Sequence, residues 1–100
     1  MNTTIREEDG KIIVVLEGRL DTAAAAKTSV DIAPVNESEG HDIVIDCTGL
    51  TYISSSGLRI LLGIRKHASE GSSRVSITGA NEDIRDVLYT TGFNNLFEIL

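Results

Sequence analysis

Three consecutive serines, Ser54, Ser55 and Ser56, are the residues best suited to chemistry in this sequence, and Gly57 follows them. A serine at the start of a helix accepts a hydrogen bond from an unpaired backbone N–H of the first turn, which is worth about 1 kcal/mol. One serine suffices for that role. The same N–H groups and the positive end of the helix dipole favour a phosphate. The triplet is therefore either a helix cap alone or a cap combined with a phosphorylation site.

Few other side chains are reactive. Cys47 follows a predicted strand, where it is either a thiol nucleophile or a small buried hydrophobic residue. We expect His41 and His67 to be solvated. A single cysteine excludes an internal disulfide, and the sequence has no Glu-x-x-His pattern, so we predict no metal site and no cofactor.

Two aspartates stand close to predicted element ends. Asp21 either caps the helix that follows it or helps to frame the serine site. Asp46 closes a predicted strand, where it stabilises the next turn or caps residues 54–57. We assign a catalytic role to neither of them.

Hydrophobic patterns predict the strands that position these residues. Short β-branched or alternating runs indicate strands at residues 3–7, 12–16, 43–45 and 74–78. Asp9 and Gly10 form a hairpin signal between the first two. We expect Gly18 to close the second strand and Asp46 to close the third.

Helical patterns follow at residues 22–32, 56–70 and 81–91. Asp21 or Thr22 caps the first helix and Pro34 ends it, whereas Gly71 and Gly92 end the other two. Residues 93–100 are expected to form a short strand or helix over the core. The order ββαβαβα predicts an α/β domain with a mixed sheet of four to five strands and helices packed against it, because strands joined through a helix run parallel.

The helix at residues 56–70 has an unusually wide apolar sector. Either neighbouring helices bury both flanks of this sector, or one edge is an exposed patch kept for a partner. The apolar residues are Gly57, Leu58, Ile60, Leu61, Leu62, Ile64 and Ala68.

The composition fits a single domain over residues 1–100, with 41% hydrophobic and 24% charged residues. A net charge of -6 argues against nucleic acid as a partner. The longest apolar run, at residues 12–16, is too short to span a membrane, and the polar, acidic start is unlike a secretion signal. We therefore expect a cytoplasmic protein without membrane insertion.

The charge is unevenly distributed along the chain. Residues 1–50 hold ten acidic and four basic residues, whereas residues 48–69 hold no acidic residue at all. Arg59, Arg65 and Lys66 lie in this second segment. They form either a solvated helix face or a contact surface for an acidic partner.

Residues 46–58, DCTGLTYISSSGL, resemble the signature of STAS domains of the anti-sigma factor antagonist family. In that signature an acidic residue closes a strand and a small hydroxyl residue follows two positions later. An aromatic residue then precedes Asp or Ser, Ser, Ser or Ala, Gly and Leu. Residues 18–21 also match the family's turn after the second strand, and residues 92–97 match its C-terminal elements. The resemblance covers nearly the whole chain.

This resemblance implies a partner-switching regulator with no catalytic activity of its own. The unmodified protein would bind an anti-sigma factor that has a histidine-kinase-like ATPase fold and acts as a serine kinase, and would thereby free a sigma factor. Phosphorylation of Ser55 would break the complex, and a metal-dependent serine phosphatase would restore it. Ser54 and Ser56 are alternative acceptors, and Ser54 stands where well-known antagonists have Asp. The residues assigned to partner binding are Asp21, Ser54, Ser56, Gly57, Leu58 and Arg59.

Two other functions stay open. The chain could be a STAS accessory or scaffold subunit of a lipid or anion transporter, without a phosphorylation cycle. It could also be a phosphocarrier that uses Cys47 as its nucleophile. In any of these roles, an exposed edge of the small sheet would allow weak self-association.

Overall fold

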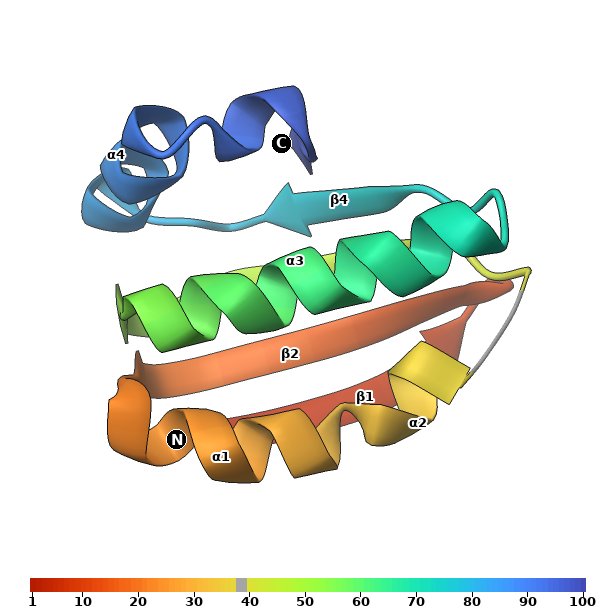
Figure 1. The fold of residues 1–100 in the computed structure, drawn as a ribbon, viewed down its shortest axis with the longest axis horizontal. Helices are drawn as coiled ribbons and strands as arrows, with labels where there is room; N and C mark the ends of the chain where they lie inside the picture. Colours follow the sequence, from red (N-terminus) through yellow and green to blue (C-terminus); the bar gives the residue numbers. More distant parts are fainter. Residues whose placement is uncertain (38–39) are drawn as a thin grey trace.

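The β-branched runs of the sequence form one five-stranded sheet in the computed structural model, which describes residues 1–37 and 40–100 (Figure 1). Its order is β1-β2-β3-β4-β5; β1 and β2 are antiparallel, and the other neighbours are parallel. This confirms the predicted mixed sheet and the α/β class. The strands are β1 (Asn2–Glu8), β2 (Lys11–Leu20), β3 (Ile43–Ile53), β4 (Val75–Thr78) and β5 (Glu98–Ile99).

The hairpin predicted at Asp9 and Gly10 joins β1 to β2. Both turn residues have positive φ angles, 52° and 78°. This is the backbone form of a two-residue turn whose twist matches that of the strands, and glycine and aspartate adopt it more readily than most residues. The hairpin prediction is therefore confirmed.

Helices α1, α2 and α3 lie over one face of the sheet, whereas α4 lies beyond the end of β4 (Figure 1). The prediction that Pro34 ends the first helix region was incomplete, because a second short helix follows. Pro34 is the second residue of that helix, in the first turn, where a missing N–H removes no intrahelical bond. The helices are α1 (Thr22–Asp31), α2 (Ala33–Glu37), α3 (Ser55–Glu70), α4 (Glu82–Thr90) and the 3-10 turn η1 (Phe93–Asn95).

Two strands run further than predicted. β2 continues through Gly18 to Leu20, and β3 continues through Asp46 to Ile53. The register of the pair shifts between Val15 and Glu17 and again after Gly18, which has a φ of 102°. In β3 these irregularities break the alternation of buried and less buried residues, whereas β2 keeps its alternation to Leu20, and the strands stay paired. The predictions that Gly18 and Asp46 close their strands were therefore wrong.

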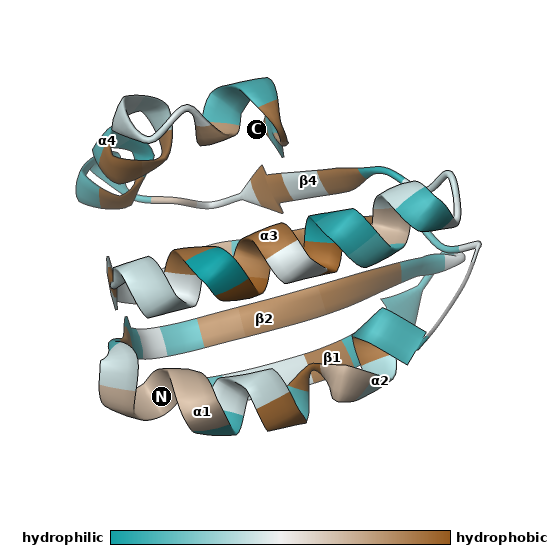
Figure 2. Ribbon diagram, in the orientation of Figure 1, coloured by the Kyte–Doolittle hydropathy of each residue, from teal (hydrophilic) through white to brown (hydrophobic). Residues whose placement is uncertain are grey.

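The core lies between the sheet and the three helices on its covered face. Side chains of the sheet that are almost fully buried, such as Val14, Ile45 and Ile77, join Leu61 and Ile64 of α3 in one cluster. Figure 2 shows the corresponding hydrophobic colour along the middle of β2 and on α3. Most of the wide apolar sector of α3 is thus buried by its neighbours.

The C-terminal residues complete the core, and they contain both elements that the sequence allowed, a short helix and a short strand. Phe93 and Phe97 are buried and their rings stack with centroids 5.5 Å apart. The N–H of Leu100 donates to the carbonyl of Ile77 at 2.8 Å, which ties the end of the chain to β4.

Candidate functional site

The serine triplet lies where two parallel strands end side by side. Leu20, the last residue of β2, is the register partner of Ile53, the last residue of β3. The N–H of Ser54 donates to the carbonyl of Leu20 at 2.9 Å. Because a helix follows each strand, α1 and α3 begin next to each other at this end of the sheet, hereafter the serine edge (Figure 1).

The three serines differ in position. Ser54 is the N-cap of α3, in extended backbone, and its Oγ accepts a hydrogen bond from the N–H of Gly57 at 3.2 Å. Ser55 is the first residue of α3 and is exposed, while Ser54 and Ser56 are half-buried. The hydroxyl of Ser55 is thus the most accessible of the three, and the capping role is already filled by Ser54.

Asp21 caps the neighbouring helix. Its Oδ1 accepts a hydrogen bond from the N–H of Ala24 at 2.8 Å at the start of α1. Asp21 directly follows Leu20, whose carbonyl accepts the hydrogen bond from Ser54. Asp21 therefore takes the predicted capping role at α1.

Gly57 has a packing role in the structure, whereas the sequence analysis assigns it to partner binding. It is buried, and a Cβ built there would lie 2.8 Å from Ile53 Cγ1 and 2.8 Å from Leu20 Cγ. Only a residue without a side chain lets the first turn of α3 lie this close to the strand ends. We therefore leave Gly57 out of the surface that could touch a partner.

The outer surface of α3 continues from Ser55 toward its middle. Arg59, one helical turn after Ser55, is exposed, and Leu62 keeps 37% of its surface exposed. Leu58 is half-buried. A polar, basic and apolar strip thus runs along α3 from the serine end.

The three basic residues predicted to form one surface have different environments. Arg59 and Lys66 are exposed, but Arg65 is half-buried and its Nε donates to the carbonyl of Leu96 at 2.7 Å. Arg65 therefore connects α3 to the C-terminal segment.

Sequence reasoning missed a pair of residues at the serine edge. The guanidinium of Arg19 lies over the ring of Tyr52, with its carbon 4.4 Å from the ring centroid. The two are register partners immediately before Leu20 and Ile53, and Tyr52 is 41% exposed. They are far apart in sequence, so only the pairing of β2 with β3 reveals that they meet.

Asp46 holds an irregular part of β3 in place. Its Oδ1 accepts hydrogen bonds from the N–H of Thr48 at 3.0 Å and from the hydroxyl of Thr48 at 2.7 Å. Both hydrogen bonds lower the pKa of the Asp46 carboxyl, and the bond from the Thr48 hydroxyl has the larger effect. Of the two roles predicted for Asp46, the structure supports the first, stabilising the residues that follow it, because Ser54 caps α3.

Cys47 is a poor candidate for a nucleophile. It is 1% exposed in the core, and burial, helped by the nearby Asp46 carboxylate, raises the pKa of its thiol to about 12. The thiol is therefore protonated at neutral pH, when a nucleophile needs the thiolate. This position fits the small buried hydrophobic residue rather than the phosphocarrier.

Other kinds of site find little support in the part of the chain that the structure describes. Residues 1–37 and 40–100 contain no group of three His, Cys, Asp or Glu side chains placed to hold a metal ion. No helix within those ranges is long and apolar enough to cross a membrane.

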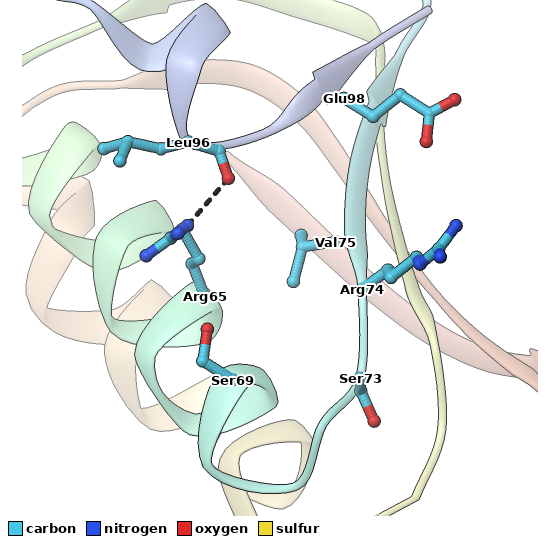
Figure 3. Close-up of a pocket in the computed structure, with 7 residues that line it drawn as sticks. All are labelled: Arg65, Ser69, Ser73, Arg74, Val75, Leu96 and Glu98. Atoms are coloured by element: carbon cyan, nitrogen blue, oxygen red, sulfur yellow. Dashed lines mark hydrogen bonds between the residues drawn. The ribbon is translucent and has the colours of Figure 1, made fainter.

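A polar groove of about 360 Å³ lies along the C-terminal half of α3, away from the serine edge. Figure 3 shows that its side chains do not converge: Arg65 and Ser69 lie on one side of Val75, and Arg74 and Glu98 lie on the other. Because Arg65 already donates to Leu96, this groove offers no built site.

The family model of the STAS domain matches residues 2–100. A STAS-domain containing protein of Pseudomonas aeruginosa is 29% identical, and the match covers 97% of this chain and 96% of that protein. An anti-sigma-B factor antagonist of Listeria monocytogenes is 26% identical, and the match covers 95% of this chain and 84% of the relative.

Solved structures share the fold. An anti-sigma factor antagonist from Mycobacterium paratuberculosis has a TM-score of 0.88 at 21% identity, over 98% of this chain and 83% of that one. The Bacillus cell fate determinant SpoIIAA in its phosphorylated form has a TM-score of 0.75 at 17% identity, over 99% of this chain and 91% of that one. Three observations agree: the motif around the serine triplet, the order of the sheet, and the family match over almost every residue. The chain therefore belongs to the STAS domain family.

Proposed function

We propose that this chain is an anti-sigma factor antagonist that changes partners according to phosphorylation of Ser55. The observation that carries the proposal is the division of roles in the serine triplet: Ser54 is used as the helix cap, and Ser55 is exposed beside it. Relatives named anti-sigma-B factor antagonist support the regulatory role. Nothing in the comparisons favours a transporter scaffold.

The partner-binding surface is the edge where α1 and α3 begin. Ser55 stands at its centre, and the strip of α3 with Leu58 and Arg59 extends it. Asp21 and Ser54 frame the same edge through capping and backbone contacts, and the half-buried Ser56 lies next to Ser55 in α3. Arg19, held on Tyr52, adds an exposed cation next to it.

Phosphate on Ser55 affects the free and the bound chain in opposite ways. In the free chain it lies at the first residue of α3, where the helix dipole and unpaired N–H groups favour negative charge. In a complex it places about 1.5 to 2 negative charges in a packed interface and adds a desolvation cost. A differential affinity of a few kcal/mol suffices to exchange partners.

The partners follow from this role. An anti-sigma factor with a histidine-kinase-like ATPase fold binds the unmodified chain and phosphorylates Ser55, and a metal-dependent serine phosphatase removes the phosphate. The chain itself catalyses neither step, and the cycle takes place in the cytoplasm.

The test is phosphate transfer and binding with the kinase-type anti-sigma factor of the native host. Ser55→Ala is expected to abolish phosphate incorporation, measured by mass spectrometry of the intact protein and its peptides, whereas Ser56→Ala keeps it. Ser55→Asp is expected to weaken binding at least tenfold in calorimetry. Since an acidic residue at the first position of a helix is favourable, this variant keeps its fold.

A matched control places the same charge elsewhere on the helix. Ser69 is also an exposed serine of α3, near the other end, so Ser69→Asp is expected to bind like the wild type. Phosphate on another residue, or equal binding by Ser55→Asp and the wild type, would contradict the proposal.

A further inference from the structure

The outer edge of β1 is a long strand edge that no other strand of the described residues covers. β1 begins one side of the sheet and pairs only with β2, in a continuous register over all seven of its residues. It contains neither proline nor a bulge, its charged residues are Arg6, Glu7 and Glu8, and all of its residues except the half-buried Thr3 are exposed. Natural sheets usually shield such an edge, because its unpaired N–H and carbonyl groups accept another strand. The opposite edge, β5, has only two residues.

The residues that face this edge can be identified from the ladder. The N–H of Ile12 donates to the carbonyl of Asp42 at 2.9 Å, so the backbone of Ile12 faces β3. Backbone direction alternates along a strand, so Ile13 and Val15 face β1 and bond to their partners there, Arg6 and Thr4. The alternate residues of β1, Thr3, Ile5 and Glu7, therefore direct their backbone groups outward.

One antiparallel register uses all three outward residues. Centring two copies of β1 on Ile5 places Ile5 opposite Ile5 of the second copy and Thr3 opposite Glu7. It also places Arg6 opposite Thr4 and Glu8 opposite Asn2, so that no like charges face each other. A register shifted by two residues places Arg6 opposite Arg6, and a shift by four places Glu7 opposite Glu7. Charge thus disfavours these two registers, and a shift by two in the other direction, which places Thr4 opposite Thr4, pairs fewer residues of β1. The register centred on Ile5 pairs all seven residues without like charges.

Apolar contacts support the same register. Ile5 is 37% exposed and borders a shallow groove of about 170 Å³ between β1 and α2, which Ile12, Pro34 and Val35 also line. Two Ile5 side chains opposite each other would lie on the helix-covered face, next to the two grooves. Their mutual contact would remove apolar surface from water.

We propose that β1 pairs antiparallel with β1 of a second copy of this chain, centred on Ile5, and joins the two sheets into one. The two-fold axis is perpendicular to the sheet, so the helices of both copies lie on the same face. The serine edges then point in opposite directions, because the paired strands are antiparallel. Dimer formation consequently leaves both Ser55 hydroxyls accessible.

The first test is molecular mass by sedimentation, from about 10 µM to about 1 mM, because pairing of a single strand buries less than a standard interface and weak affinity is expected. The mass should rise toward that of two chains. Ile5→Pro removes one outward N–H while keeping the bonds to β2, and should give a monomer throughout this range.

Two variants of Thr4 test the register without touching the core, since Thr4 is exposed. Thr4→Lys places a cation opposite Arg6 of the second copy, twice by symmetry, and should raise the dimer dissociation constant about fivefold. Thr4→Glu should lower it by a similar factor. The net charge of the chain predicts the reverse order, because Thr4→Lys reduces the overall repulsion, so the sign of the change is decisive.

Several results would overturn the proposal. These are a mass of one chain at every concentration, a dimer that Ile5→Pro leaves intact, or Thr4 variants that change affinity in the opposite sense. Pairing of β1 with an extended segment of a different protein instead of a second copy would also overturn it. If Ile5→Pro fails to fold, the Thr4 variants still decide.

Discussion

Gly57 sets how closely α3 lies against the strand ends, and through this contact it sets the position of Ser55. Leu20 and Ile53 occupy the space that a side chain at this position would need. The sequence showed a glycine with a cost in helix propensity, but it could not show the reason. That reason lies in two residues, distant in sequence, that the pairing of β2 with β3 brings together.

Gly57→Ala is expected to lower the free energy of unfolding by about 1 to 2 kcal/mol, because the cost of overpacking exceeds the gain in helix propensity. Urea unfolding followed by circular dichroism measures it. Gly63→Ala is the matched control in the same helix, since a Cβ at Gly63 meets no atom within 4 Å. It should stabilise the protein by up to about 1 kcal/mol, and equal effects at both positions would refute the packing argument.

The serine triplet shows which properties of single residues the sequence can predict and which it cannot. Residue types and family spacing predict Ser55 as the acceptor, but three hydroxyls in a row cannot by themselves be divided into a cap and an exposed group. The bond from Gly57 to the Ser54 oxygen makes that division. Arg19 and Tyr52 were missed for a related reason, because cation–π contacts between strands leave no local pattern.

At the scale of the elements, side-chain caps at the serine edge start two helices at defined residues. Asp21 caps α1 and Ser54 caps α3, each accepting from an N–H three residues later. The sequence located both helix starts within one residue, since capping chemistry is local. The ends of β2 and β3 were located poorly, because β2 continues through Gly18 and β3 continues through polar residues and register shifts that break its period of two.

Asp21→Ala is expected to cost about 1 kcal/mol of stability, because it leaves the N–H of Ala24 without its acceptor. Asp21→Asn keeps a side-chain oxygen at the cap and should retain most of the stability. Thermal unfolding of the pair measures the difference. A similar loss in both variants would mean that the carboxylate charge, rather than the cap, matters.

At the scale of the whole molecule, the C-terminal segment closes the core instead of trailing from it. Phe93 and Phe97 are buried, and Arg65 of α3 donates to the carbonyl of Leu96, which lies between them in the sequence. The apolar character of residues 93–100 predicted this covering role. The α/β class and the mixed sheet were also predictable, because the order of elements and the crossover rule leave few arrangements.

Phe97→Ala is expected to lower the free energy of unfolding by about 3 to 5 kcal/mol, through the loss of a buried ring and its stacking on Phe93. This is a large share of the roughly 5 to 15 kcal/mol that stabilises a domain. Leu96→Ala, one residue away and 39% exposed, should cost less than about 1 kcal/mol. Chemical denaturation of both variants checks this, and comparable losses would show that the tail is only loosely packed.

The Asp9 and Gly10 turn of the hairpin has a practical consequence. β2 starts directly after this turn and ends next to Ser54, ten residues later, so roughly 30 Å of strand separates the turn from the serine edge. Both turn residues are exposed. A fluorophore or a surface tether attached there would keep the binding edge pointing into solution, so that exchange of partners can be timed on immobilised single molecules.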